Sequence, residues 1–159
     1  MYAVILLKEL DRSMLSSGKM VEVNSAEDAM WFPAMIIKET DVDDKKSFIA
    51  KEWDRYMSCN GGDEGRPNRT VDSRCVRPIS PPSSVDTTYS LMDCVEAFYG
   101  SGWYKGRVSA IYSDKSYIVK LEATERKSEF QHTDLRPFMT WEDGVWRDDL
   151  KTLISRYYY

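Results

Sequence analysis

The chain has 159 residues, of which 42% are hydrophobic and 13% aromatic, enough apolar material for one medium domain or two small ones. Its net charge is −4, and residues 18–82 and 83–159 each carry ten basic and twelve acidic residues. This composition disfavours disorder along the whole chain and a protein that grips nucleic-acid phosphates. A mildly acidic surface suits a basic peptide as partner, or serves only to keep the protein in solution.

The first ten residues, MYAVILLKEL, hold a short apolar run without the basic start and small-residue cleavage site of a signal peptide. We expect residues 1–17 to be an N-terminal extension packed on a domain. No stretch approaches the roughly 20 apolar residues of a membrane span, so no membrane partner is expected. Cys59, Cys75 and Cys94 have no C-x-x-C spacing, which disfavours a zinc site or a disulfide framework and favours reduced thiols in the cytosol or nucleus.

The first half of the chain contains four short segments of alternating apolar residues. They lie at residues 18–23, 30–37, 47–53 and 70–78. The sequence DDKK, at residues 43–46, predicts a hairpin loop between the second and third segments. A glycine-rich polar insertion at residues 58–69 predicts a long loop before the fourth.

A stretch rich in proline, serine and threonine, residues 78–90, separates the two halves and predicts a linker, which we place at residues 81–90. The same order of segments then recurs. It occupies residues 92–98, 102–111, 116–121 and 129–137, with a hairpin loop at 112–116. The dipeptide Asp143-Gly144, between Trp141 and Trp146, predicts one more hairpin. The tail, residues 148–159, fits a helix or a strand equally well.

Each half therefore offers four or five short strands within about 60 residues and no helical pattern. A small sheet of this kind exposes its edge strands unless it curls and closes. We expect one such barrel in residues 18–80 and a second in residues 91–147.

The two halves also share an ordered set of short motifs. The first strand contains Val-Glu at residues 21–22 and again at 95–96, and the last ends in Arg-Pro at residues 77–78 and 136–137. Between them, an aromatic pair opens the second strand, Trp-Phe at 31–32 and Trp-Tyr at 103–104, and a small residue follows. Over roughly residues 18–146 this set resembles the Agenet domain, the plant branch of the Tudor-like β-barrels.

The resemblance implies an all-β fold of two small Tudor/SH3-like five-stranded barrels in tandem, packed against each other. It also implies a binding role, with no catalysis and no cofactor. Related barrels hold methylated lysine or arginine in a cage of aromatic rings, often with one carboxylate. Their rings come from the first loop, the start of the second strand, and the end of the third strand with the loop after it.

Carried over to the first half, these positions give Trp31 and Phe32 at the start of the second strand. Trp53 and Tyr56 would replace the ring missing at the third-strand end, and Asp28 would supply the carboxylate. We expect this half to hold the ligand, because Trp53 and Tyr56 follow a strand and precede a glycine-rich loop, where a ring is less suited to core packing.

The second half offers a less complete site formed by Tyr99, Trp103 and Tyr104. Leu121 and Glu122 stand where the third-strand ring is expected. In both halves, strand alternation sends one member of the adjacent aromatic pair inward and the other outward. We therefore expect one ring of each pair to pack in the core and the other to be able to line a pocket.

Two functions fit this reading. The first is a nuclear, chromatin-associated reader of a basic, lysine-methylated histone tail; the second is a scaffold that binds an unmodified partner peptide in a chromatin or transcription complex. Nucleic acid is disfavoured as a partner by the charge. His132, beside Asp134, is interpreted as a polar turn residue, and the acidic cluster at residues 41–44 as a hairpin tip. No catalytic residue and no metal ligand is predicted.

Overall fold

The computed structural model describes residues 15–25, 29–53, 68–81, 83–113 and 115–148. These residues form the short strands that the sequence predicts, together with short 3-10 turns. The chain divides into two compact units with a boundary between Ile79 and Ser80, and residues 27–30 are grouped with the second unit. No helix among the described residues has the length and apolar character that crossing a membrane requires.

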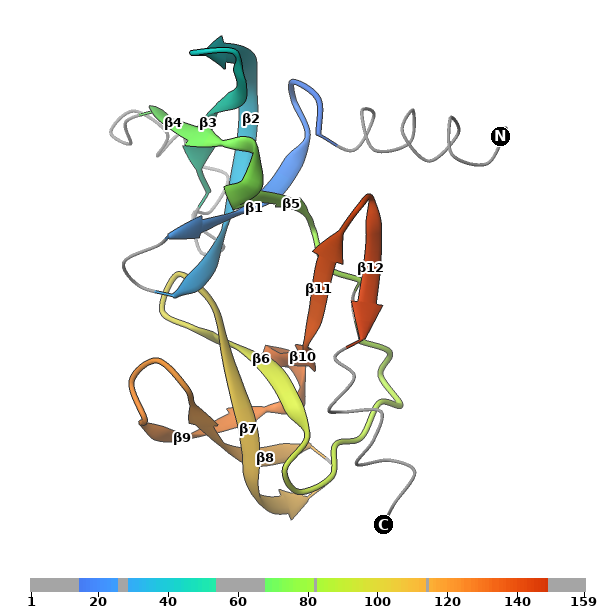
Figure 1. Cartoon of the computed structure of the whole chain (residues 1–159). Coiled ribbons are helices and arrows are strands. Elements are labelled where there is room, and N and C mark those ends of the chain that lie inside the picture. Colours follow the sequence, from blue (N-terminus) through green and yellow to red (C-terminus); the bar gives the residue numbers. More distant parts are fainter. Residues whose placement is uncertain (1–14, 26–28, 54–67, 82, 114, 149–159) are drawn as a thin grey trace, which may run out of the picture. The chain divides into compact units, whose positions relative to one another are not determined.

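The first unit, called here the first barrel, is a curved antiparallel sheet (Figure 1). Its elements are β1 (Met20–Ser25), β2 (Met30–Val42), β3 (Lys45–Glu52), β4 (Asn68–Asp72), the 3-10 turn η1 (Ser73–Cys75) and β5 (Val76–Pro78). The strands lie in the order β4-β3-β2-β1-β5. The predicted hairpin loop is confirmed: Asp43 and Asp44 connect β2 to β3, and both have positive φ, as a two-residue hairpin turn requires.

The second unit, the second barrel, repeats this plan. Its elements are β6 (Cys94–Tyr99), β7 (Gly102–Ser113), β8 (Ser116–Leu121), β9 (Lys127–Gln131), η2 (His132–Asp134) and β10 (Leu135–Pro137). The order is β9-β8-β7-β6-β10. A separate two-stranded sheet follows, β11 (Met139–Glu142) and β12 (Val145–Asp148), whose turn holds Asp143 and Gly144 as predicted.

The long second strand of each barrel bends at the same place. The pairing of β2 with β3 shifts between Ile36 and Lys38, and the pairing of β7 with β8 shifts between Val108 and Ala110. A bulge of this kind increases local twist and lets one strand belong to both sides of a small barrel. Ile36 and Val108 lie 72 positions apart, as do Trp31 and Trp103, so the internal repeat is structural as well as sequential.

Each barrel has its own apolar interior, which positions the rings discussed below. In the first barrel the buried side chains come from alternate positions of the strands: Val21, Val23, Phe32, Ala34, Ile36, Phe48, Ala50 and Val76. In the second barrel they form one cluster: Val95, Ala97, Val108, Tyr117, Val119, Leu121, Phe130 and Leu135, with Tyr89 from the segment before β6. The half-buried Tyr104 packs against this cluster.

Candidate aromatic binding site

A buried ion pair under a tryptophan ring joins three strands of the first barrel. Glu22 on β1 lies directly opposite Arg77 on β5, and Arg77 Nε donates to Glu22 Oε1 at 2.9 Å. Both side chains are almost fully buried. The guanidinium carbon of Arg77 lies 4.0 Å from the centre of the Trp31 ring. A buried charge pair needs such additional contacts, because desolvation offsets much of its mutual attraction.

The second barrel contains the same arrangement. Arg136 on β10 donates from Nε to Glu96 Oε1 on β6 at 3.0 Å, and its guanidinium carbon lies 3.9 Å from the centre of the Trp103 ring. Glu96 is 1% exposed and Arg136 4%. The repeated Val-Glu, Trp and Arg-Pro motifs therefore mark a structural unit that both barrels share.

This arrangement gives Trp31 and Trp103 an arginine partner from within their own barrels. A guanidinium stacked on an aromatic ring covers one of its two electron-rich faces, so a second cation cannot bind on that face. Trp103 also packs edge-on against Phe98, with the ring centres 5.2 Å apart. Both tryptophans are thus placed chiefly as partners of the buried ion pairs.

The other member of each aromatic pair points to the opposite face of its strand, as alternation predicts. Phe32 is 4% exposed and belongs to the core of the first barrel. Tyr104 lies opposite Ala97 and packs against the core of the second. The sequence-based expectation that one ring of the pair packs inward therefore holds for Phe32 and for Tyr104.

A cluster of three rings lies at the end of the second barrel. Tyr99, the last residue of β6, stands at 73° to Tyr104, with ring centres 6.3 Å apart. It stands at 72° to Phe130 on β9, with ring centres 6.4 Å apart. Tyr99 is 40% exposed, whereas Phe130 is buried. Tyr99, Tyr104 and Phe130 are called the Tyr99 cluster below.

Two of the residues predicted for the second barrel, Tyr99 and Tyr104, are thus brought together, while Trp103 lies on the opposite strand face. Phe130 was not among the predicted site residues. Its signal is modest: in the segment KSEFQ it is the only large apolar residue, and it lies opposite Tyr117 of the core. The fourth strand was not among the positions that the family resemblance indicated.

A cation from the same chain already sits at the Tyr99 cluster. The guanidinium carbon of Arg126 lies 5.6 Å from the centre of the Tyr99 ring. Arg126 Nη1 donates a hydrogen bond to the Tyr99 hydroxyl at 3.0 Å. The Tyr99 ring and its hydroxyl therefore already contact one organic cation.

The first barrel has a different arrangement at the corresponding end. The guanidinium carbon of Arg69, on β4, lies 5.6 Å from the centre of the Phe32 ring. A nitrogen of the same guanidinium lies 3.9 Å from a Glu52 carboxylate oxygen. A ring and a carboxylate thus converge on one cation here, although the buried Phe32 offers little of its surface to solvent.

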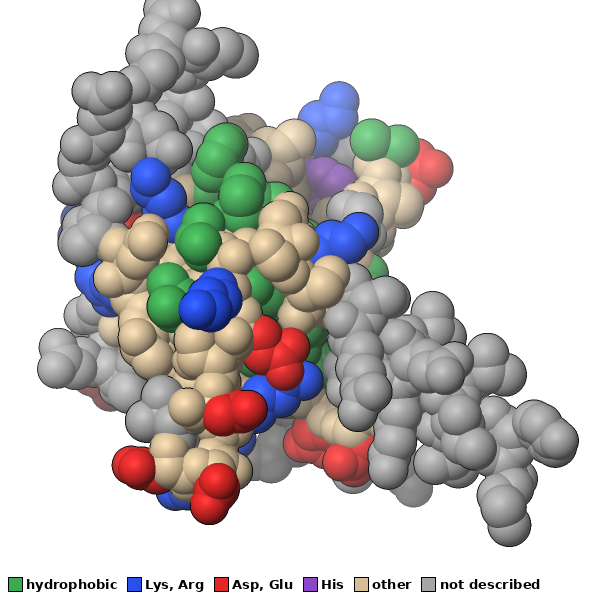
Figure 2. All heavy atoms as spheres, turned by 90° about the horizontal axis from the view of Figure 1, so that it is seen from above, with side chains coloured by type: hydrophobic (Ala, Val, Ile, Leu, Met, Phe, Trp, Pro, Cys, Tyr) green, Lys and Arg blue, Asp and Glu red, His purple; other side chains and the backbone are tan. Residues whose placement is uncertain are grey.

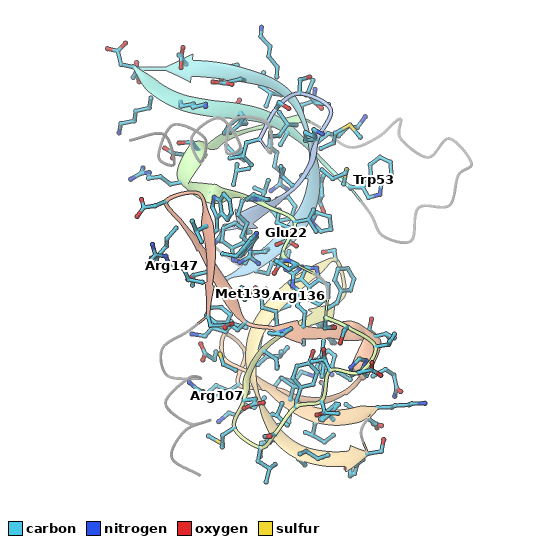
Figure 3. The ribbon with its side chains drawn as sticks, turned by 90° about the vertical axis from the view of Figure 1, so that its right-hand side faces the viewer. Glu22, Trp53, Arg107, Arg136, Met139 and Arg147 are labelled. Carbon is cyan, nitrogen blue, oxygen red and sulfur yellow. The ribbon has the colours of Figure 1, made fainter. Side chains whose placement is uncertain are left out.

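Among the described residues of the first barrel, Trp53 is the aromatic ring most exposed to solvent. It follows β3 at the outer edge of that barrel (Figure 3), and 44% of its surface is exposed. Its backbone N–H donates to the Pro33 carbonyl at 2.8 Å, and Glu122 makes the equivalent bond to Lys105 in the second barrel at 3.0 Å. Trp53 therefore occupies the third-strand end, where the family resemblance expects a ring.

Within the described residues, the Trp53 ring makes no ring contact with Trp31 or Phe32. The remaining residues predicted for this site, Asp28 and Tyr56, lie outside the described residues. The site proposed for the first barrel is therefore represented here by Trp31, Phe32 and Trp53.

His132 has structural partners. It begins η2, and its Nε2 is hydrogen-bonded to the Thr87 carbonyl. Its ring lies 6.0 Å from that of Tyr89, whose phenol has a pKa raised chiefly by burial. Among the described residues, no three His, Cys, Asp or Glu side chains gather closely enough to hold a metal ion.

Two small barrels of five antiparallel strands, each closed by a 3-10 turn before its last strand, define a tandem of Tudor-like binding modules. The profile of one such family, the Agenet domain, matches residues 18–81. Residues 18–81 are thus an Agenet domain, and the second barrel repeats the plan of this domain. The matched domain is of a binding type and not a catalytic type.

Solved structures agree with this assignment over most of the chain. The crystal structure of the ADCP1 tandem Agenet domain 3-4 superimposes with a TM-score of 0.71 and 26% identity, covering 91% of this chain and 94% of that one. Arabidopsis thaliana AGDP1 AGD34 gives a TM-score of 0.72 and 26% identity, covering 90% and 95%. The all-β tandem fold predicted from the sequence is confirmed.

Curated relatives are longer proteins of Arabidopsis thaliana. DUF724 domain-containing protein 3 is 60% identical over 145 residues, which are 91% of this chain and 21% of that protein. DUF724 domain-containing protein 6 is 48% identical over 148 residues, again 91% of this chain and 21% of that protein. The chain thus spans about a fifth of the length of these two relatives.

Proposed function

We propose that this chain is a chromatin reader that binds a basic, lysine-methylated histone tail through exposed aromatic rings. The observation that carries the proposal is the Tyr99 cluster, in which two rings stand roughly at right angles to a third and the third already contacts a guanidinium. A cluster that contacts one organic cation has the chemistry to accept another.

Methylation makes a lysine suited to such a cluster. The methylated ammonium keeps its charge and loses hydrogen-bond donors, so water holds it less firmly while the face of a ring still attracts it. One exposed ring contributes about 0.5–1 kcal/mol, whereas micromolar affinity requires about 8 kcal/mol. Several rings and main-chain contacts from the peptide are therefore needed together.

The first barrel contributes a second proposed contact region. Trp31, Phe32, Trp53 and Tyr56, with Asp28 as the carboxylate, remain the proposed set there. Its support in the structure is the exposed Trp53 ring at the third-strand end and the carboxylate of Glu52 beside it in sequence. A basic tail could place different side chains at the two barrels.

Charge supports a basic peptide over nucleic acid. Figure 2 shows lysine and arginine side chains scattered over the face in view, without a broad basic field. Binding to a phosphate backbone needs several lysine or arginine side chains aimed at one strand. We place the protein in the nucleus, where histone tails are found.

One observation favours the alternative function, a scaffold that binds an unmodified partner peptide in a chromatin or transcription complex. At the third-strand end the second barrel carries Glu122, paired with Lys105 at 3.6 Å, in place of a ring. A carboxylate at this position attracts an unmodified lysine or arginine as well as a methylated one.

The two functions are separated by a modified histone peptide array probed with the intact chain. The reader function predicts signals for lysine-methylated basic peptides that clearly exceed those of the same peptides without methyl groups. Equal signals for modified and unmodified peptides would support the scaffold, and binding to neither would contradict both.

A further inference from the structure

We propose that Arg126 is an internal occupant of the Tyr99 cluster, and that a ligand cation binds Tyr99 only after the Arg126 side chain has moved away. This inference rests on the proposed function of the cluster. It assigns Arg126 a role in setting affinity that no feature of the sequence alone indicates.

The loop between β8 and β9 holds the backbone of Arg126 in place. The Arg126 carbonyl accepts a hydrogen bond from the Leu121 N–H at 2.9 Å, and its own N–H donates to Thr124 Oγ1 at 3.3 Å. Glu125, just before it, has a φ of 55°, which closes the loop tightly. The Arg126 side chain therefore starts from a fixed point beside the Tyr99 ring.

The contact with Tyr99 is weak enough to be exchanged. The Arg126 side chain is exposed, and its 5.6 Å distance from the ring centre is close to the limit of about 6 Å for a cation–π contact. Its hydrogen bond at Tyr99 goes to a neutral hydroxyl. An arginine held in this way spends part of its time elsewhere, leaving the ring open.

Arg126 and a ligand cation exclude each other at this site. Two positive charges beside one ring repel, and the more strongly as the peptide removes water from between them. The apparent affinity for a ligand is then the intrinsic affinity reduced by the fraction of molecules whose site is empty. Arg126 thus raises the threshold that a cation must exceed to bind.

The test uses the intact chain and the tetramethylammonium ion, a probe with the charge and methyl groups of a methylated lysine but no peptide contacts. Its dissociation constant is measured by NMR from the ring signals of Tyr99 and Tyr104. We expect Arg126→Ala to tighten binding by about two- to fivefold, the size of one exposed ring contact. Tyr99→Phe keeps the ring, removes the acceptor of the Arg126 hydrogen bond, and should tighten binding in the same direction.

Lys127→Ala is the matched control, because it removes one positive charge from the neighbouring exposed residue. It should leave the dissociation constant unchanged, which separates release of the ring from a general loss of repulsion. Equal binding by the wild type and Arg126→Ala, or equal tightening by Lys127→Ala, would overturn the role of Arg126.

Failure of the proposed function gives a different result. If tetramethylammonium shifts no ring signal in any variant, or neutral neopentyl alcohol binds as well as the ion, the Tyr99 cluster is not a cation site. The second-barrel site of the proposed function then falls together with the internal occupant. If the ion binds every variant alike, the cation site stands and only the internal occupant is overturned.

Discussion

The two barrels share a framework and differ at the ends where a ligand would bind. Both contain a buried glutamate–arginine pair under a tryptophan and a bulge at the same position of the long strand. At the ends, the first barrel brings Arg69 to Phe32 and Glu52, while the second brings Arg126 to an exposed tyrosine beside two further rings. The repeated residues therefore meet a requirement of the fold, and the proposed binding contacts lie among the residues that differ.

This difference also suggests how the barrels divide their work. In the first barrel the internal arginine has a carboxylate partner, which favours keeping it in place. In the second, the partners of the internal arginine among the described residues are a ring and a hydroxyl. A ligand cation displaces the second arginine more easily, so on this comparison the second barrel is the better candidate for cation capture, and the exposed Trp53 marks the first barrel for a supporting contact.

The largest expected effect concerns the shared framework. Glu22→Ala and Glu96→Ala each leave a buried arginine without its counter-charge, which destabilises a protein by about 3–5 kcal/mol. Urea denaturation of the intact chain should show similar losses for the two variants. Replacing both partners of the second pair, Glu96→Leu with Arg136→Met, should cost much less. Losses below about 1 kcal/mol would contradict the structural role.

A smaller loss of stability is expected at the position two residues after the aromatic pair, where the two barrels differ. A methyl group added at Gly106 would lie 2.7 Å from the Lys120 carbonyl oxygen and 2.7 Å from Val119 Cγ1. Overpacking of this kind costs about 1–3 kcal/mol, so Gly106→Ala should lower the free energy of unfolding. The first barrel has Ala34 at the corresponding position, fully buried. If Gly106→Ala unfolds at the same temperature as the wild type, β7 and β8 can move apart to accommodate the methyl group, and the expected overpacking is absent.

The loss of peptide affinity should differ between variants of the exposed rings in the two barrels. Tyr99→Ala removes the most exposed ring of its cluster and should weaken binding of a methylated peptide by about 1–3 kcal/mol. Trp53→Ala should cost no more than this, because the Trp53 ring stands apart from Trp31 and Phe32. Calorimetric titration of both variants checks the order. A larger loss for Trp53→Ala would move the main site to the first barrel.

The smallest effect concerns the turns that close the barrels. The Asp72 carboxylate accepts hydrogen bonds from the Arg74 side chain and backbone N–H, and these lower its pKa below the ordinary value. The stabilisation is present above the unfolded pKa, about 3.9, and is lost as the pH falls through the folded value. Gln131 holds the corresponding position before η2 and makes no side-chain cap bond.

Below about pH 4 we therefore expect the Arg74 amide signal to shift in an NMR titration, and Asp72→Asn to remove that titration. The amide of Thr133, at the matching place in the second barrel, should show no comparable step. A shift at Arg74 that persists in Asp72→Asn would assign it to another group.

Much of the fold could be predicted because alternation and turn chemistry are local. The dipeptides Asp43-Asp44 and Asp143-Gly144 are each enough to predict a hairpin turn. The internal repeat adds a second example of each strand. The roles of Glu22, Arg77 and Trp31 could not be read in this way. They lie far apart in the chain, and only the closed barrel places the arginine between the carboxylate and the ring.

The site was harder to predict for the same reason. Tyr99 and Tyr104 could be named because the resemblance points to the first loop and the second strand. Phe130 and Arg126 come from the fourth strand and the loop before it, and their approach to Tyr99 depends on how the sheet curls. The sequence names both Trp103 and Tyr104 for this site and predicts that only one of them lines it, because neighbours in a strand point to opposite faces.

The central claim is that a methylated lysine is read by rings of this chain. Its most direct test is calorimetric titration of the intact chain with one histone-tail peptide in trimethylated and unmethylated forms, repeated with Tyr99→Ala. The account predicts that the wild type binds the trimethylated peptide at least several-fold more tightly, and that Tyr99→Ala removes most of this preference while binding to the unmethylated peptide changes little. Equal affinity of the wild type for the two peptides would contradict the account.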